Sequence, residues 1–222
     1  MKLPKFFETL EGQISAILII IVIVLFGYYF YATGGKGTAP VTIEINATDH
    51  VKGNLTSQIT LVEFGDFQCP SCGGWEPTVE KVIKDNEKDI KFVFKNFPLT
   101  QMHMNALLAA KSAESAGVQG KYWEMHDMIY AGQKEWSESP LAKDLFISYA
   151  QKLGLDIEKF KSDLNNKSIE DNILAEYTEG TKLGVQGTPT FFLNGKKLEG
   201  MQSFDDLEKL VKQEIEKQKT SN

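Results

Sequence analysis

The sequence predicts an α/β domain that contains an inserted all-helical block and is preceded by one transmembrane helix. Three observations lead to this prediction. An almost unbroken apolar run occupies residues 14–31. A strand, a helix and a second strand follow one another between residues 59 and 94. Helical periodicity then continues from about residue 100 to residue 184, before a terminal hairpin and a last helix.

The composition fits one globular domain with an additional segment. The chain has 222 residues, of which 42% are hydrophobic, and a domain of this size can bury a sizeable core. Its net charge of −6 at pH 7 has the wrong sign for binding nucleic-acid phosphates. We therefore expect no nucleic-acid partner.

The apolar run is long enough to cross a bilayer. As an α-helix, its 18 residues would extend over about 27 Å. Lys2 and Lys5 precede the run, which predicts a cytoplasmic N-terminus over residues 1–13 and a single-pass anchor over residues 14–31. A glycine-rich tether follows at residues 32–40.

A cleaved signal peptide is the alternative interpretation of this segment. Gly37, Thr38 and Ala39 provide small residues for a signal peptidase, although the apolar run is longer than a signal peptide usually needs. In either case residues 41–222 are expected to leave the cytoplasm for a compartment in which disulfides persist. The predicted location is the cell membrane, with the domain on its outer side.

The domain begins with short elements and continues with a βαβ unit. Residues 41–45 alternate well enough for a short strand, and residues 49–54 are typical of a turn. Residues 59–64 form a β-branched, apolar run that predicts a buried strand. Apolar residues at helical spacing follow at 75–86, and a second strand is expected at 90–94. A strand, a helix and a strand in this order predict a parallel pair.

The remainder of the chain predicts helices and one hairpin. Asn194 and Gly195 form a tight-turn signal between two short strand candidates, and a last amphipathic helix begins near Phe204. The helices expected in the inserted block, about residues 100–184, cover 106–116, 122–130, 141–153, 157–164 and 169–183.

The two cysteines of the chain, Cys69 and Cys72, lie at the junction between the first predicted strand and helix. This spacing is typical of a redox pair or of half a metal site. A position at a helix N-terminus favours a thiolate at Cys69, because unpaired N–H groups and the helix dipole face it. The loop that a disulfide would close here is too short to stabilise the fold much. We therefore predict a redox pair in which Cys69 is exposed and Cys72 is partly covered.

Taken together, these motifs resemble the DsbA-like branch of the thioredoxin superfamily, and most closely the membrane-anchored bacterial proteins of the BdbD type. The resemblance implies a thioredoxin-like fold over residues 41–222, with the helical block as its insertion. It also implies that Cys69 is the nucleophile and Cys72 the resolving thiol. Four landmarks carry it, at residues 63–72, 103–110, 119–126 and 187–190.

The same resemblance assigns roles to three further residues. Thr188 and Pro189 would form a cis-proline loop that lies against the disulfide and pairs with an extended substrate peptide. Glu63 would be a buried acid that relays the proton of Cys72, with a pKa raised by burial. From the residues alone, a pair such as Thr188-Pro189 is more often an ordinary trans turn, and Glu63 could face solvent on an edge strand.

The resemblance implies an oxidase that donates the Cys69–Cys72 disulfide to exported proteins with thiols. A membrane redox partner, in this family usually a quinone-linked oxidase, would restore the disulfide. A membrane-tethered reductase or an isomerase would use the same residues, and the Pro-Ser dipeptide between the cysteines does not decide the direction.

A copper carrier is a third class, because soft thiolates suit Cu(I). It would need another ligand, for which His103 is the best candidate. His50 is expected in a loop, and His126 is expected to be packed within a helix. No EF-hand spacing is present, so we expect no metal ligands and no cofactor other than the redox-active disulfide.

Overall fold

The structure is a computed structural model that describes residues 10–33, 40–201 and 203–221. The chain divides into two compact units, Met1–Ala39 and Pro40–Asn222. The predicted cytoplasmic residues 1–9 and the tether residues 34–39, which include the alternative cleavage site, lie outside the described residues.

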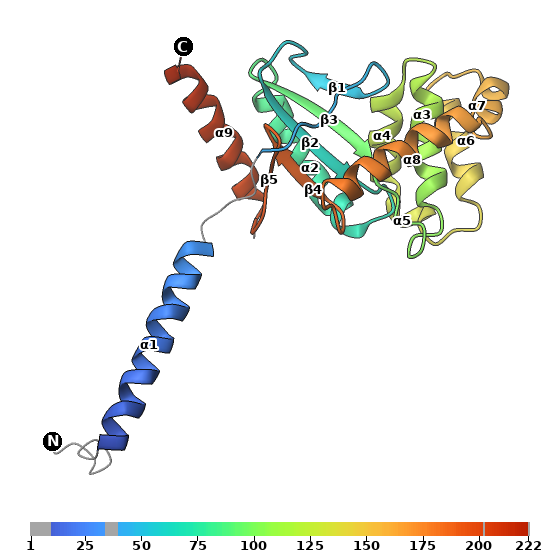
Figure 1. Ribbon diagram of the computed structural model, residues 1–222. Coiled ribbons are helices and arrows are strands. Elements are labelled where there is room, and N and C mark those ends of the chain that lie inside the picture. The colour runs from blue at the N-terminus through green and yellow to red at the C-terminus, as the bar shows by residue number, and fades with distance from the viewer. Residues whose placement is uncertain (1–9, 34–39, 202, 222) are drawn as a thin grey trace. The chain divides into compact units, whose positions relative to one another are not determined.

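The first unit contains helix α1, which spans Leu10–Thr33 (Figure 1). Its described isoleucine, leucine and valine side chains are largely exposed. The segment predicted to cross a membrane, residues 14–31, lies within this helix. Among the residues that the structure describes, however, no helix is both long enough and apolar enough to span a bilayer.

The second unit is built on a sheet in which the described strands have the order β1-β3-β2-β4-β5 (Figure 1). Strand β2 pairs in parallel with β3 and antiparallel with β4, so β2 is central. Helix α2, Pro70–Asp85, connects β2 to β3 and completes the predicted βαβ unit. The strands are β1 His50–Gly53, β2 Ile59–Gly65, β3 Ile90–Asn96, β4 Thr190–Leu193 and β5 Lys196–Lys197.

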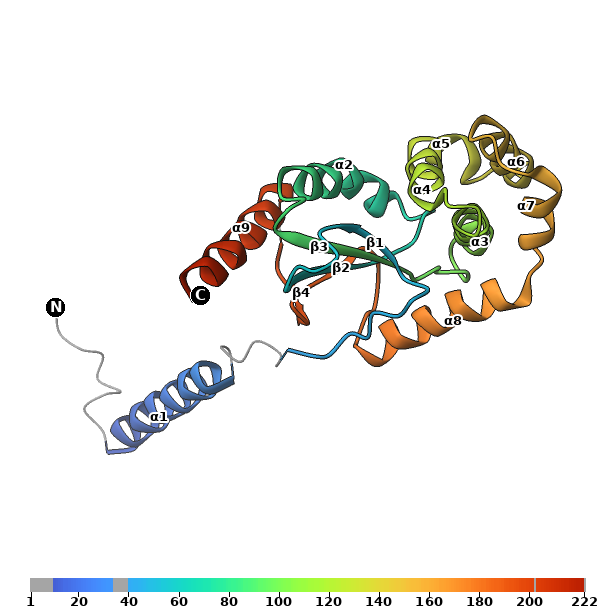
Figure 2. The same ribbon diagram turned by 90° about the horizontal axis from the view of Figure 1, so that it is seen from above.

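The inserted helical block is confirmed. Helix α2 lies against one face of the sheet, α8 runs along the opposite face, and the block extends from one end of the sheet (Figure 2). The short helix α5 was not predicted. The helices after β3 are α3 Ala106–Gly117, α4 Tyr122–Ala131, α5 Gln133–Trp136, α6 Ala142–Lys152, α7 Ile157–Asp163, α8 Lys167–Lys182 and, after the hairpin, α9 Phe204–Ser221.

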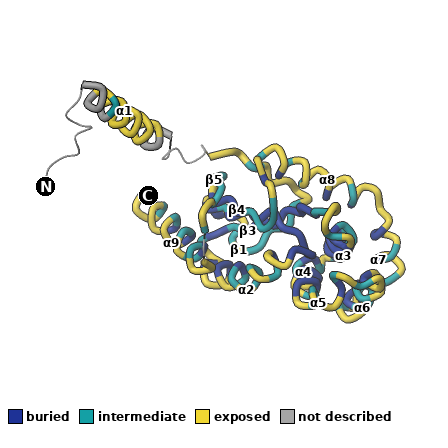
Figure 3. Tube along the Cα trace, turned by 90° about the horizontal axis from the view of Figure 1, so that it is seen from below, coloured by how far each residue is buried: buried dark blue, intermediate teal, exposed yellow. Residues whose placement is uncertain are grey.

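The alternation of side chains along β2 determines what faces α2. Leu61 joins the main core cluster with residues of α2, whereas Val62 and Phe64 belong to a second cluster on the opposite face. Buried residues accordingly concentrate along the sheet and the inner helix faces (Figure 3). Because side chains two positions apart share a face, Glu63 points to the same side as Leu61. That side carries the thiols.

Two predictions near the start of the domain are wrong. Residues 41–45 form no strand, and residues 50–53 form strand β1 rather than a turn, so His50 lies in a strand and not in a loop. The reason for the first error is a side-chain contact. The buried Lys95 ammonium donates 3.0 Å hydrogen bonds to the Glu44 carbonyl oxygen and to the Asp49 carboxylate. This contact holds the segment against β3 without strand pairing.

A buried carboxyl group in α8 yields a stability prediction. Burial, followed by the neighbouring Glu114, raises the pKa of Glu176 to about 8. The folded protein therefore holds a proton that the unfolded chain releases near pH 4.5, and stability falls as pH rises through 8. Replacing Glu176 by glutamine should raise the free energy of unfolding by roughly 3 kcal/mol at pH 7. Urea unfolding at pH 5 and pH 8 tests this, and an equal gain at both values would contradict it.

Candidate active site

The two thiols lie at the start of α2. Cys69 is the N-cap residue, with an extended backbone (φ −66°, ψ 120°), and Pro70 follows in the first turn. Both cysteines are free thiols. Cys69 retains 8% of its surface in contact with solvent and Cys72 retains 1%. The prediction that Cys69 is exposed is therefore wrong, because the helical block and the loop before β4 cover it, but Cys69 remains more accessible than Cys72.

The environment of Cys69 favours its thiolate. A hydrogen bond from Cys72 is the largest cause, and it lowers the pKa of Cys69 from 9.0 to about 5 against the opposing effect of burial. Thr188 and the backbone N–H groups of Ser71 and Cys72 act in the same direction. The Thr188 Oγ1 atom is buried and has no other hydrogen-bond partner within the described part of the chain. It is therefore available to the sulfur.

This pKa yields a prediction about reactivity. Alkylation of the reduced protein by iodoacetamide should follow a titration with its midpoint near pH 5, and Cys69→Ser should remove that step. Because the folded pKa lies below the unfolded value, the thiolate stabilises the reduced fold at alkaline pH, and this contribution is lost as pH falls towards 5. A single alkylation step near pH 9 would contradict the prediction.

Cys72 has the opposite character. Burial is the main cause that raises its pKa well above 9.0, and the nearby Glu63 adds to the shift. The backbone N–H of Asp66 donates a 3.5 Å hydrogen bond to Cys72 Sγ. Cys72 therefore keeps its proton at neutral pH, and a base must remove that proton before the sulfur can attack.

Glu63 is a buried acid on the face of the sheet that carries the thiols. It is 2% exposed and is flanked by Phe94 on β3 and Phe191 on β4. Burial, then the carboxylate of Glu76, raises its pKa well above 4.5. The alternative of a solvent-facing residue on an edge strand is wrong, because β2 is central. A carboxyl group with a pKa raised in this way can hold a proton at a pH at which an exposed glutamate is ionised.

The loop before β4 completes the surroundings of Cys69. The peptide bond between Thr188 and Pro189 is cis, as the resemblance implies. The Cys69 thiol donates a 3.3 Å hydrogen bond to the Thr188 carbonyl oxygen. The structure thus brings together the thiols, Glu63 and this loop from sequence positions that are far apart.

One buried carboxylate at this site, Asp66, was not predicted from the sequence. Asp66 accepts hydrogen bonds from the backbone N–H groups of Gln68 at 2.8 Å and Leu99 at 2.9 Å. Its Oδ2 also lies 2.6 Å from His103 Nδ1. His103, the candidate copper ligand, is therefore engaged by Asp66. The local sequence showed neither that Asp66 is buried nor that His103 is near it.

A second histidine stands close to two carboxylates. His126 is buried, as predicted, and its Nδ1 lies 3.0 Å from Asp127 Oδ1 and 3.8 Å from Glu76 Oε1. Ligand atoms of these three residues all lie within 4.8 Å of one another and could hold a metal ion. Glu76 and His126 lie on α2 and α4, so spacing along the chain did not suggest this group.

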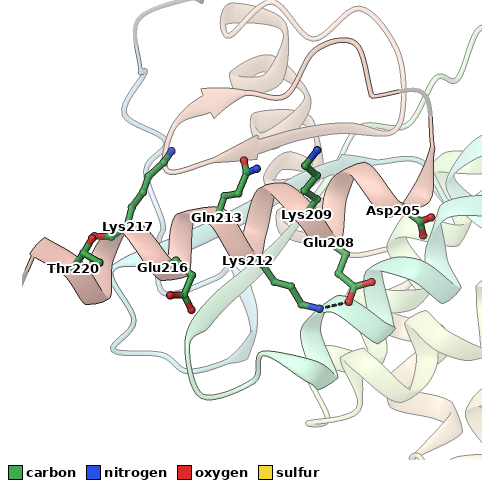
Figure 4. Close-up of a pocket in the computed structure, with 8 residues that line it drawn as sticks. All are labelled: Asp205, Glu208, Lys209, Lys212, Gln213, Glu216, Lys217 and Thr220. Carbon is green, nitrogen blue, oxygen red and sulfur yellow. Dashed lines mark hydrogen bonds and ion pairs between the residues drawn. The ribbon is translucent and has the colours of Figure 1, made fainter.

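A surface hollow of about 680 Å³ lies along α9 and includes none of the residues described above. The residues around it carry charged or polar groups, and Lys209, Lys212 and Glu216 are among them, although mainly the apolar parts of these side chains face the hollow (Figure 4). The Lys212 ammonium donates a hydrogen bond to Glu208 within it. The thiol site is therefore separate from this hollow.

Solved structures of bacterial thiol–disulfide exchange proteins have a similar fold. Oxidised BdbD from Bacillus subtilis superposes with a TM-score of 0.69 at 22% identity, covering 81% of this chain and 100% of that one. α-DsbA1 from Wolbachia pipientis gives 0.69 at 21% identity, covering 79% and 94%. The fold is thus thioredoxin-like.

The family follows from sequence. The profile of the family described as Thioredoxin matches residues 45–213, and the chain belongs to this family. A probable disulfide bond formation protein D from Bacillus cereus is 32% identical over 176 residues, which cover 77% of this chain and 81% of that protein. A Na⁺/H⁺ antiporter NhaA 1 from Salinispora arenicola is 40% identical over 73% of this chain, but the chain spans only 24% of its length.

Proposed function

We propose that this protein is an extracytoplasmic thiol–disulfide oxidoreductase that acts as an oxidase and donates the Cys69–Cys72 disulfide to exported proteins. The observation that carries the proposal is the contrast between the two sulfurs. The pKa of Cys69 is lowered to about 5, whereas burial raises that of Cys72. A stabilised Cys69 thiolate favours the reduced pair, and a pair that favours its reduced form is an oxidant.

In the donating direction, a client thiolate attacks Cys69 Sγ of the disulfide. A bond forms between the client sulfur and Cys69, the Cys69–Cys72 bond breaks, and the Cys72 sulfur leaves and takes up a proton. A second client thiolate then attacks the client sulfur of the mixed disulfide, and Cys69 leaves as a thiolate. The client is oxidised by two electrons and the pair is reduced by two. The low pKa of Cys69 makes it a good leaving group in this last step.

Glu63 is proposed to exchange the proton of Cys72. It supplies the proton when Cys72 leaves and accepts it when the pair is reoxidised, when Cys72 must attack as a thiolate. The loop at Thr188 and Pro189 is proposed to align the client beside Cys69. Its Thr188 carbonyl oxygen lies 3.3 Å from the Cys69 sulfur and would be available to an extended client chain.

Location and partners belong to the same proposal. The apolar residues 14–31 support a single-pass anchor in the cell membrane, with the N-terminus in the cytoplasm and the domain outside. A membrane redox partner, a quinone-linked oxidase, would then restore the disulfide. Protease added to intact spheroplasts should cleave the domain, and protection until the cells are lysed would place it in the cytoplasm.

The reduction potential tests the direction of the reaction. We expect the full chain, equilibrated in glutathione buffers with detergent, to give a value more oxidising than about −180 mV. A value near −270 mV would instead indicate a reductase, and the partner to seek would be an electron donor.

A further inference from the structure

One side chain of the helical block, that of Gln133, donates hydrogen bonds to the backbone at the nucleophile Cys69. The amide Nε2 of Gln133, the first residue of α5, donates hydrogen bonds to the Phe67 carbonyl oxygen at 2.7 Å and to the Cys69 carbonyl oxygen at 2.9 Å. The Cys69 carbonyl oxygen also accepts the N–H of Gly73 at 3.1 Å, which is the first bond of α2. Gln133 thus joins the inserted block to the residue that carries the reactive thiol.

The surroundings fix Gln133 in this position. The Gln133 carbonyl oxygen accepts the N–H of Ser137 at 3.0 Å and also its hydroxyl group. A second link lies beside it, because the Gln68 amide donates to the Ser137 carbonyl oxygen at 2.7 Å. The side-chain amides of Gln133 and Gln68 therefore link the segment before α2 to the segment around α5, one from each segment.

The close approach of Gln133 requires a glycine in α2. A Cβ atom added to Gly73 would lie 2.6 Å from Gln133 Oε1, so alanine at this position would force the amide to move. Helix propensity alone would favour alanine over glycine there. The glycine is explained by the space that the amide occupies.

We propose that Gln133 is a positioning residue, through which the helical block holds the Cys69 backbone so that its sulfur faces the N–H groups at the start of α2. The reasoning is geometric. The direction of the Cys69 side chain depends on its φ and ψ angles, and two bonds on its carbonyl oxygen hold ψ. When the sulfur is aligned, the N–H groups of Ser71 and Cys72 stabilise its thiolate. A sulfur that turns away loses these donors.

The first test replaces Gln133 by methionine, which keeps the length of the side chain and removes both donors. We expect the alkylation midpoint of Cys69 to move upward by about one pH unit and the glutathione equilibrium to shift about tenfold towards the disulfide, equivalent to about 30 mV.

Gln119 provides the matched control. Its amide also bridges the backbone within the block, by donating to the Asp156 carbonyl oxygen at 3.2 Å and accepting the Asp156 N–H at 2.9 Å. Gln119→Met should lower the melting temperature as Gln133→Met does, without moving the midpoint or the equilibrium. Equal shifts of the Cys69 alkylation midpoint in the two variants, or no shift of this midpoint in Gln133→Met, would overturn the proposal.

A second variant keeps the test decisive if Gln133→Met folds poorly. Gly73→Ala displaces the amide but leaves the glutamine in place, and should move the Cys69 midpoint in the same direction. In a Gln133→Met background, the same alanine should add no further shift, because the contact it disturbs is already absent. A full additional shift there would show that Gly73 acts through another contact and would count against the proposal.

The inference rests on the thiol–disulfide exchange of the proposed function, and the two can fail separately. The potential of the unmodified protein tests the direction of exchange. The difference between Gln133→Met and the unmodified protein tests Gln133 alone. If the reduction potential is that of a reductase but still shifts in Gln133→Met, the proposed oxidase activity is refuted and the positioning role of Gln133 is retained.

Discussion

Replacing Cys72 by serine is expected to stop turnover and to trap clients on Cys69. The variant retains the Cys69 sulfur, which attacks a client disulfide as a thiolate: the bond between Cys69 and the client forms, the client disulfide breaks, and the other client sulfur leaves as a thiolate. It lacks the second sulfur, so it cannot form the disulfide that it donates and has no thiol of its own to release a client held on Cys69. Turnover should fall by at least about 10³-fold, because no other thiol of the chain can take over this step.

The measurement is the recovery of covalent adducts from cells under non-reducing conditions. Cys69→Ser is the matched control, because it keeps one cysteine and leaves the strand–helix junction otherwise unchanged. Its remaining thiol, Cys72, is 1% exposed and has a raised pKa, so few adducts are expected. Equal adduct yields from the two variants would contradict the assignment of nucleophile and resolving thiol.

The position of the thiol pair could be predicted because the pattern that marks it is local. A strand, the two cysteines and the start of a helix occupy a short stretch, and the chemistry of a helix N-terminus needs only that stretch. The lowered pKa of Cys69 agrees with this prediction, and the raised pKa of Cys72 follows mainly from its burial. Local sequence therefore indicated the site, whereas the difference between its two sulfurs also depends on burial and on Thr188, which lies 119 residues further along the chain.

The direction of Glu63 could not be predicted from its own strand. The alternation of side chains along the strand allowed Glu63 to face either the core or solvent. Which of the two applies depends on whether β2 is a central or an edge strand. One neighbour of β2 in the sheet is β4, in which Phe191 pairs with Glu63. The whole helical block separates these two strands in the sequence. Gln133 shows the same limitation, because it reaches the Cys69 carbonyl oxygen from a position 64 residues away. Contacts over such separations follow from the packing of the block.

The missing strand at residues 41–45 has a different cause. The alternating pattern is present, but a strand also needs a ladder of backbone hydrogen bonds to a neighbouring strand. Here the segment is held by the Lys95 ammonium at the Glu44 carbonyl oxygen and by the Val41 N–H, which donates to the Gly195 carbonyl oxygen at 2.9 Å. Lys95 is 1% exposed, and its charge is compensated by Asp49, at 3.0 Å, and by Glu179, also at 3.0 Å. A buried lysine needs such partners, and they hold the segment in an irregular conformation. Nothing in the pattern of the segment itself indicated this lysine.

Replacing Glu63 by glutamine is expected to slow the reoxidation of the reduced pair by about 100-fold at neutral pH, the usual contribution of a general base. Cys72 must lose its proton before it attacks, and burial raises its pKa well above 9.0. An ionised Glu63 can accept that proton, so the rate should rise with pH as Glu63 ionises. Glutamine cannot accept it, and the variant should lose this rise in stopped-flow measurements of disulfide formation.

Stability separates this role from damage to the fold. The folded pKa of Glu63 lies well above 4.5, so its contribution to stability is present at low pH and is lost as pH rises through the folded value. Glutamine never ionises, so Glu63→Gln should be more stable than the unmodified protein at alkaline pH while it is slower. Glu176→Gln is the matched control, because that carboxyl is also buried with a raised pKa but bonds to Asn96 instead. Glu176→Gln should be more stable at alkaline pH than the unmodified protein, with an unchanged rate of disulfide formation. If both variants slow the reaction equally, proton relay through Glu63 is refuted.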